Sequence, residues 1–399
     1  MRGNLVRVWA VGLLPALLLP VLTACTEPET PPRPLRIGLI VPQVGQLDFA
    51  VGEPGRLAAT LAVQEVNARG GVKIGDIRRP VVLHVENNED RPEVAVQVAR
   101  RLINQEQVVA LVGPFLSRNA LAVAHVAENL ATPMISPTAT HPELTTDRQY
   151  VFQASTDNDI QGRALAKFAR DELQARNAAV LFDVASAYNR SLAEIFRQSF
   201  LALGGERVTF ESYVTGEEDF RPQLERLAPV DPDVLLLPNY NLEVPSQAQI
   251  ARELGLRAVF LGGDTWNQAL YPPIPSLTGS YFVNQWHPDA QNEASRSFVD
   301  RCEKGLQRTP TSIMALAYDS VGLILGALEA AGSTDGPSVR QALAGLQDFP
   351  AVTGRFSFRD RGAPIKEVQL IHIQDFQAIL HRTIAPDQLP PPVPSGEQP

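Results

Sequence analysis

The sequence contains few cysteines and few lysines. Only 2 of its 399 residues are Cys, which excludes both a disulfide-rich scaffold and a zinc site with four thiolate ligands. Of its 35 basic residues only 4 are Lys, no basic run occurs, and 44 acidic residues give a formal net charge of −9. Because nucleic-acid binding depends on neutralising phosphates, we expect no nucleic-acid partner.

Enzyme signatures are also missing. The sequence has no GxSxG, HExxH, Walker-type loop or GxGxxG motif, and its six histidines show no metal-ligand spacing. We therefore expect no catalysis, no cofactor and no bound metal. A hydrophobic content of 44% is that of a globular protein, and the length suggests two or three domains.

The first residues have the pattern of a secretory leader. Arg2 and Arg7 precede an apolar stretch from Val8 to Val21, which is shorter than the ~20 residues of a membrane-spanning helix and contains two prolines. It ends in Leu-Thr-Ala-Cys25, which resembles the lipobox of bacterial lipoproteins. The resemblance implies a signal peptide at 1–24 and a lipid on Cys25. The alternative is an ordinary signal peptide that happens to be cut near a cysteine.

Prolines gather at both ends of the remaining chain. Residues 25–34 are predicted to be a Pro-rich tether, and residues 385–399 a disordered Pro-rich tail. Without the leader, 33 basic and 44 acidic residues give a net charge of −11. If Cys25 is acylated, Cys302 has no intramolecular partner, and we expect it to be a small buried residue.

From residue 35 onward, short β-rich runs alternate with amphipathic helical stretches. The alternation occurs twice, before and after about residue 157, and predicts an α/β fold with two parallel-rich sheets covered by helices. After residue 290 three helical stretches come consecutively, followed by strand-like runs at 355–358 and 368–373. The chain is therefore expected to return and complete each half.

Small hydroxyl residues follow two of the predicted strands, where open α/β sheets bind ligands. Ser117 starts a helix after the strand 108–112, so it is either a simple N-cap or, with the N–H groups of the helix start, a ligand of a carboxylate. Thr138, Ala139 and Thr140 follow the strand 133–136 and suit either a satisfied turn or a cradle for a polar ligand.

Three further residues follow strands of the second half. Asp264 can cap a local turn or pair with a ligand ammonium, and Tyr188 and Tyr240 can cover a ligand or simply pack. Neither reading is decided by the local sequence.

Several segments together resemble the type I periplasmic binding proteins, specifically the leucine/isoleucine/valine-binding family of branched-chain amino-acid ABC transporters. The run Met134–Thr145 is the most specific match, and the Asn-Ala-Arg-Gly-Gly element ending at Gly71 is next. The other matching segments are Ile37–Pro42, Val112–Ser117, Gln161-Gly162, Asp219-Phe220 and Pro232–Leu235.

The resemblance implies two Rossmann-like lobes with parallel-rich central sheets, joined by a three-strand hinge. Lobe 1 is expected to comprise residues 35–156 plus 287–350, and lobe 2 residues 157–286 plus 351–384. The crossing strands are expected near 155, 286 and 351.

The resemblance also implies roles for the candidate residues. Ser117 and the loop Thr138–Ala139–Thr140 would hold the α-carboxylate and part of the α-amino group of an amino acid. Asp264 would face the ammonium, Tyr188 and Tyr240 would close lobe 2 over the ligand, and Asn158 would be a polar residue near the hinge. Val51 stands where some branched-chain binders have a tryptophan, so the side-chain pocket is expected to differ.

The implied function is that of a lipid-anchored solute-binding protein of the cell envelope. It would capture an amino acid, with branched-chain amino acids among the candidates, and deliver it to an ABC permease, with the membrane reached through the lipid. A sensory lipoprotein with the same clamshell is the alternative. An envelope enzyme is disfavoured by the missing motifs.

Overall fold

The computed structural model describes residues 1, 3, 32–266, 274–290, 292–358 and 362–393. Arg33–Pro399 form one compact unit. Cys25 and most of the expected signal peptide lie outside the described residues, as do residues 394–399 of the expected tail.

The first sheet has five parallel strands in the order β4-β1-β5-β6-β7. The strands are β1 (Leu35–Val41), β4 (Val81–Asn87), β5 (Ala110–Val112), β6 (Met134–Ser136) and β7 (Val151–Gln153). One face is covered by α2 (Glu53–Ala68), α9 (Glu293–Arg301), α10 (Ser312–Ala331) and α11 (Gly336–Ala344), and the other by α3 (Pro92–Asn104) and α4 (Ser117–Asn129). We call this sheet and its helices lobe 1.

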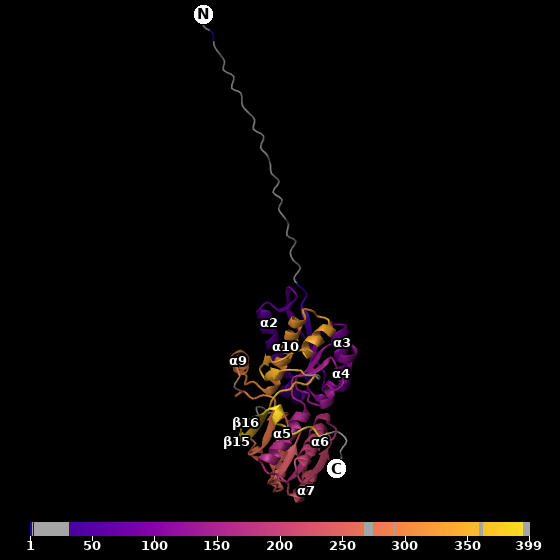
Figure 1. The fold of residues 1–399 in the computed structure, drawn as a ribbon, viewed down its shortest axis with the longest axis vertical. Helices are drawn as coiled ribbons and strands as arrows, with labels where there is room; N and C mark the ends of the chain where they lie inside the picture. Colours follow the sequence, from indigo (N-terminus) through magenta and orange to yellow (C-terminus); the bar gives the residue numbers. More distant parts are fainter. Residues whose placement is uncertain (2, 4–31, 267–273, 291, 359–361, 394–399) are drawn as a thin grey trace. The chain divides into compact units, whose positions relative to one another are not determined.

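The second sheet has seven strands in the order β16-β15-β12-β11-β10-β8-β9. They are β8 (Asn177–Asp183), β9 (Arg207–Tyr213), β10 (Val234–Leu237), β11 (Val259–Gly262), β12 (Tyr281–Asn284), β15 (Val368–Gln374) and β16 (Gln377–Ile384). The pairs β12–β15 and β15–β16 are antiparallel, and the other pairs of this sheet are parallel. The faces carry α5 (Asn158–Asp171) with α6 (Ala187–Ala202), and α7 (Arg221–Leu227) with α8 (Val244–Glu253). This is lobe 2; Figure 1 shows the labelled helices of each lobe gathered around its sheet.

The remaining elements are short. They are α1 (Gly45–Leu47), the π-helical turn Asp48–Gly52, β2 (Val72–Ile74), β3 (Ile77–Arg79), β13 (Phe349–Ala351) and β14 (Gly354–Phe356), with 3-10 turns at Pro142–Leu144, Ala228–Val230, Pro275–Leu277 and Pro386–Gln388 and a π-helical turn at Cys302–Leu306. The expected α/β class with two parallel-rich sheets is confirmed.

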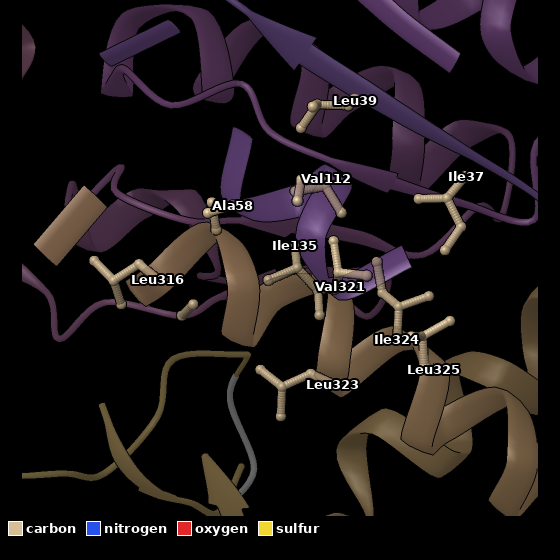
Figure 2. Packing of buried hydrophobic residues seen from close by; sticks show 14 of the residues in the cluster. Ile37, Leu39, Ala58, Val112, Ile135, Leu316, Val321, Leu323, Ile324 and Leu325 are labelled. Atoms are coloured by element: carbon tan, nitrogen blue, oxygen red, sulfur yellow. The ribbon is translucent and has the colours of Figure 1, made fainter. Parts of the chain in front are cut away.

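Helix α10 forms the centre of the lobe 1 core. Figure 2 shows its Val321 beside Ile135 of the sheet, and its Leu316 near Ala58 of α2. Among the described helices it alone is long and apolar enough to cross a membrane, with a mean hydropathy of 1.5, but 67% of that stretch is buried inside the protein. Its apolar composition is therefore explained by its place in the core.

The chain passes between the lobes after β7, after β12 and between Phe358 and β15. The third crossing comes later than expected, because the β13–β14 hairpin and Phe358 belong to the lobe 1 core. Phe358 packs edge-on against Phe152, with ring centroids 5.1 Å apart. The expected boundary at 350/351 is therefore corrected to one beyond Phe358. Cys302 is buried in lobe 1, and burial raises the pKa of its thiol to about 12.

The start of the expected disordered tail is held in place. Residues 386–388 form a 3-10 turn directly after β16, and Leu389 packs against the lobe 2 core. The Arg163 guanidinium on α5 donates to the carbonyl oxygen of Pro390 over 2.6 Å. Residues 385–393 thus differ from the expectation because they have partners on α5 and the lobe 2 core.

Candidate functional site

A cavity of about 90 Å³ lies between the lobes, at the carboxyl ends of strands from both sheets. Lobe 1 contributes Gln46, Leu47, Ala50, Val51, Phe115, Leu116, Ser117, Thr138, Ser312, Ile313 and Leu316. Lobe 2 contributes Tyr188, Tyr240, Asn241, Leu242, Asp264 and Thr265, and Gln285 comes from the second crossing. Of these lining residues, Asp264 alone carries a charge.

The carboxylate of Asp264 is held by neutral donors. Its Oδ2 accepts from Nε2 of Gln285 over 2.9 Å and from Nε2 of Gln161 over 3.0 Å, and its Oδ1 accepts from the Tyr188 hydroxyl over 3.1 Å. No ion pair to it occurs within the described part of the chain. Burial raises the pKa of Asp264 to about 6, although the three donors oppose that rise. A cation placed in the cavity would satisfy this charge.

The two tyrosines lie side by side on the lobe 2 wall. Their ring centroids are 5.7 Å apart, and both rings line the cavity. Burial raises the pKa of Tyr188 well above its usual range and that of Tyr240 to about 12, so both hydroxyls remain protonated at neutral pH. Tyr188 lies in the first turn of α6. Its hydroxyl holds Asp264 and its ring lines the cavity.

The lobe 1 wall offers hydroxyls and a helix start. Ser117 is the first residue of α4, and the N-cap position is held by Leu116 without a side-chain bond. Of the two alternatives for Ser117, the structure does not support the N-cap. Instead the Ser117 hydroxyl accepts from the backbone N–H of Thr140 over 3.3 Å. The Thr138 hydroxyl donates to the carbonyl oxygen of Phe115 over 2.8 Å. The first N–H groups of a helix have no acceptor inside it, and their dipole favours an anion.

Three of the expected site residues lie behind the cavity rather than on its wall. The carbonyl oxygen of Ala139 accepts from Nε2 of Gln153 over 2.8 Å, and that of Thr140 accepts from the backbone N–H of Asn158 over 2.8 Å. Asn158 Nδ2 in turn donates to the carbonyl oxygen of Tyr188 over 3.1 Å. These residues therefore position Ser117 and Tyr188, and Asn158 ties the two lobes together.

Two glutamines of the site do not follow from local sequence patterns. Gln161 lies one turn into α5, and its only signal is its place in the matched Gln161-Gly162 pair. Gln285 Oε1 accepts from the backbone N–H of Thr156 over 2.9 Å while its Nε2 reaches Asp264. Both amides thus connect Asp264 to the crossing segments.

The apolar end of the cavity also comes from sequence-distant elements. Leu47, Ala50 and Val51 precede α2, whereas Ile313 and Leu316 come from the first turns of α10. Their convergence requires the α2–α10 pairing of the lobe 1 core. Within the described residues, no three His, Cys, Asp or Glu side chains are grouped to hold a metal ion.

The cavity lining therefore has two unlike parts. The polar part combines the half-buried carboxylate of Asp264, its three amide or phenol donors, two hydroxyls and a helix start, and the apolar part is aliphatic and aromatic. Such a site can take up a small molecule with one cationic group, one anionic group and an apolar tail.

Comparisons with known proteins agree on one family. The periplasmic binding protein family matches residues 34–377. A Leu/Ile/Val-binding protein of Rhizobium johnstonii is 27% identical over 334 residues, which cover 82% of this chain and 88% of the relative.

Solved structures give the same result. A leucine-binding protein of Thermotoga maritima matches with a TM-score of 0.82 and 27% identity, covering 89% of this chain and all of that one. A branched-chain amino-acid transporter substrate-binding protein of Streptococcus pneumoniae, in complex with isoleucine, matches with a TM-score of 0.79 and 27% identity, covering 88% and 98%.

Proposed function

The chain belongs to the type I periplasmic binding proteins of the branched-chain amino-acid family, and from this premise we propose that it binds an α-amino acid with an apolar side chain and delivers it to an ABC permease. Asp264 would receive the ammonium group. Ser117, Thr138 and the start of α4 would receive the carboxylate, and the aliphatic end would receive the side chain.

The observation that carries this proposal is the uncompensated carboxylate of Asp264. A buried charge without a partner of opposite sign is costly, and the protein supplies only neutral donors. An α-ammonium supplies the missing charge. A simple carboxylic acid of the same size would instead leave Asp264 uncompensated, so the site favours a zwitterion over an anion.

The apolar end supports an aliphatic side chain. Burying a leucine-sized side chain contributes roughly 1.5–3 kcal/mol. A charged side chain would meet Leu47, Ile313 and Leu316 there and would find no partner. Since the relatives from Rhizobium johnstonii and Streptococcus pneumoniae are described for Leu, Ile and Val binding or hold isoleucine, leucine and isoleucine are the first ligands to test.

Binding would also favour closure of the lobes. The carboxylate contacts come from lobe 1 and the ammonium contact from lobe 2, so a ligand completes its contacts only when both lobes reach it. Closure then excludes water and strengthens each contact. We further propose that the protein works outside the cytoplasm and is held to the membrane by a lipid on Cys25.

Calorimetry with three related probes tests the ligand proposal. We expect the chain to bind leucine and to bind 4-methylpentanoate, which lacks the ammonium, and 3-methylbutylamine, which lacks the carboxylate, far more weakly. Asp264→Asn should weaken leucine binding by about 100-fold or more, because breaking a buried ion pair costs roughly 3–5 kcal/mol. Asp76→Asn, at an exposed residue of the β2–β3 turn, is the matched control.

Two outcomes would contradict the proposal. One is the absence of a thermal shift with any of the standard amino acids. The other is equal affinity of Asp264→Asn and the parent for leucine. The anchor is tested separately: mass spectrometry of the membrane-extracted chain should show an acylated N-terminal Cys25, and Cys25→Ala should abolish that modification.

A further inference from the structure

We propose that lobe 1 carries a docking surface for anionic lipid at the end opposite the ligand cavity. The surface, which we call the basic end, consists of Arg33, Arg69, Lys73, Arg78 and Arg79. It rests on the proposed lipid attachment at Cys25, because that attachment is what brings a membrane near.

The five residues are neighbours in the structure. Lys73 of β2 and Arg78 of β3 lie directly opposite each other in the hairpin. Arg69 and Arg78 line one surface pocket of about 540 Å³, and Lys73 and Arg78 line the next. The Arg79 guanidinium donates to the carbonyl oxygen of Arg33 over 2.8 Å, which places the start of the described domain beside the hairpin.

The charges of the basic end are not balanced by ion pairs. None of its five side chains forms an ion pair with a carboxylate of the described chain, whereas Arg91, Arg176 and Arg382 elsewhere do. Exposed Asp76 lies in the turn, and Glu329 accepts from the backbone N–H of Lys73. Asp319 and Arg301 also line the larger pocket. Six cations against three carboxylates leave a local charge of +3 in a chain whose net charge is −9.

The Lys73–Arg78 pair is itself unfavourable. Like charges directly opposite in an antiparallel pair destabilise the sheet. An external anion between them would remove that repulsion. The hairpin also presents Ile77 with 59% of its surface exposed, so an apolar side chain stands among the cations, as on proteins that lie at lipid interfaces.

The length of the tether between Cys25 and Arg33 favours a lipid surface as the partner of the basic end. Eight residue steps separate Cys25 from Arg33, and a fully extended chain spans at most about 3.6 Å per residue. A lipid on Cys25 therefore holds Arg33 within about 30 Å of the bilayer. The basic end is the part of the domain nearest that point, and each Lys or Arg at an anionic surface adds about 1 kcal/mol of attraction.

Docking in this way leaves the ligand site accessible. β1 starts at Leu35 beside the basic end, and its other end at Val41 leads into the cavity residues that precede α2. With the basic end on the lipid, the cavity opens away from the bilayer. The surface thus orients the tethered receptor for capture from solution.

Vesicle co-sedimentation tests the surface without the anchor. Because Arg33–Pro399 form a compact unit, the chain from residue 26, lacking the leader and Cys25, is used. We expect it to bind phosphatidylcholine vesicles containing one quarter phosphatidylglycerol at about 50 mM salt, and to be released at high salt as screening shortens the Debye length. Pure phosphatidylcholine vesicles should not bind it.

Two double variants test whether vesicle binding depends on the basic end or only on the number of positive charges. Lys73→Gln with Arg78→Gln should lower the partition coefficient by about tenfold or more. The matched control, Arg207→Gln with Arg257→Gln, removes two exposed cations of lobe 2. Neither forms an ion pair with a carboxylate of the described residues, and their removal should change the partition coefficient little. Equal losses in both double variants, or equal binding to both vesicle types, would overturn the proposal. Leucine affinity is measured on the same samples and should stay unchanged in both double variants. If the unsubstituted chain from residue 26 binds leucine but does not bind the anionic vesicles, the docking surface is refuted and the solute-binding proposal stands.

Discussion

Two aspartates, Asp319 buried in lobe 1 and Asp264 half-buried at the cavity wall of lobe 2, have opposite surroundings. Asp319 on α10 in lobe 1 accepts from the backbone N–H groups of Val352 and Thr353 over 2.8 Å each, and the buried Lys366 ammonium donates to the Thr353 hydroxyl over 2.7 Å. Asp264 in lobe 2 has side-chain donors, but no cation of the described residues forms an ion pair with it. The charge of Asp319 is thus countered within the protein, whereas we propose that the charge of Asp264 pairs with a ligand.

The pKa values reflect this difference. Burial raises the pKa of both carboxyls, and at Asp319 the backbone donors and Lys366 counter that rise. Burial also lowers the pKa of Lys366 to about 7, although Asp319 acts against the fall. Asp319, whose charge Lys366 counters, joins the turn between β13 and β14 to α10 and has a structural role. The carboxylate of Asp264 remains available to pair with a bound cation.

The largest expected effect is on the free energy of unfolding, which should distinguish Asp319 from Asp264. Asp319→Ala should lower the free energy of unfolding by roughly 3–5 kcal/mol, because it removes the acceptor of two buried backbone N–H groups and the negative charge that acts on the buried Lys366. Asp264→Asn should change it much less, since the hydrogen-bonding side chains around it remain. Urea unfolding of the ligand-free variants measures both. Equal losses would show that the two sites do not differ in this way.

A smaller effect is expected on the pH dependence of binding. The pKa of Asp264 without ligand is about 6, and only the ionised carboxylate pairs with an ammonium. Leucine affinity should therefore be constant above pH 7 and fall as the pH drops through 6, becoming roughly tenfold weaker at pH 5. Calorimetry across this range measures the fall.

The control for this prediction is a second carboxyl with a similar pKa. Burial also raises the pKa of Asp157 to about 6, and its side chain caps α5 by accepting from the N–H of Ile160 over 3.1 Å. Asp157→Asn preserves the cap, because Asn is an equally good N-cap residue. The pH dependence should persist in this variant. If it vanished there, Asp157 and not Asp264 would be the titrating group.

The same pKa has a consequence for the ligand-free protein. Its folded-state value lies above the ordinary value near 4, so the contribution of Asp264 to stability is full below pH 4 and is lost as the pH rises through 6. A bound ammonium should remove that loss. The ligand-induced rise in melting temperature should accordingly be larger at pH 7 than at pH 5.

The smallest effect concerns a single hydrogen bond of the site. Tyr188→Phe removes the donor to Oδ1 of Asp264 but keeps the ring beside Tyr240. We expect leucine affinity to fall about fivefold, the equivalent of roughly 1 kcal/mol for one hydrogen bond. Tyr318→Phe, which removes a hydroxyl bond to Glu65 of α2 away from the cavity lining, should leave affinity unchanged.

Local sequence patterns correctly predicted the cavity residues that directly follow strands. Ser117, Thr138 and Asp264 come after β5, β6 and β11, and all three line the cavity. Patterns could not tell that Ala139, Thr140 and Asn158 lie behind the wall, because the direction of a loop side chain depends on what packs against it. The same holds for Gln285, whose amide orientation is set by Thr156 across the crossing.

By itself, the sequence determined the α/β class, the two series of strands and helices, and the residues at the carboxyl ends of the strands, since hydrophobic periodicity and turn residues act over short distances. The tertiary structure alone decided the rest. It packs the β13–β14 hairpin into the lobe 1 core and places Lys366 close enough to Asp319 to counter its charge. It places no such cation beside Asp264 among the described residues. Those outcomes depend on which distant side chains share a buried space, and burial is what makes a missing charge partner costly.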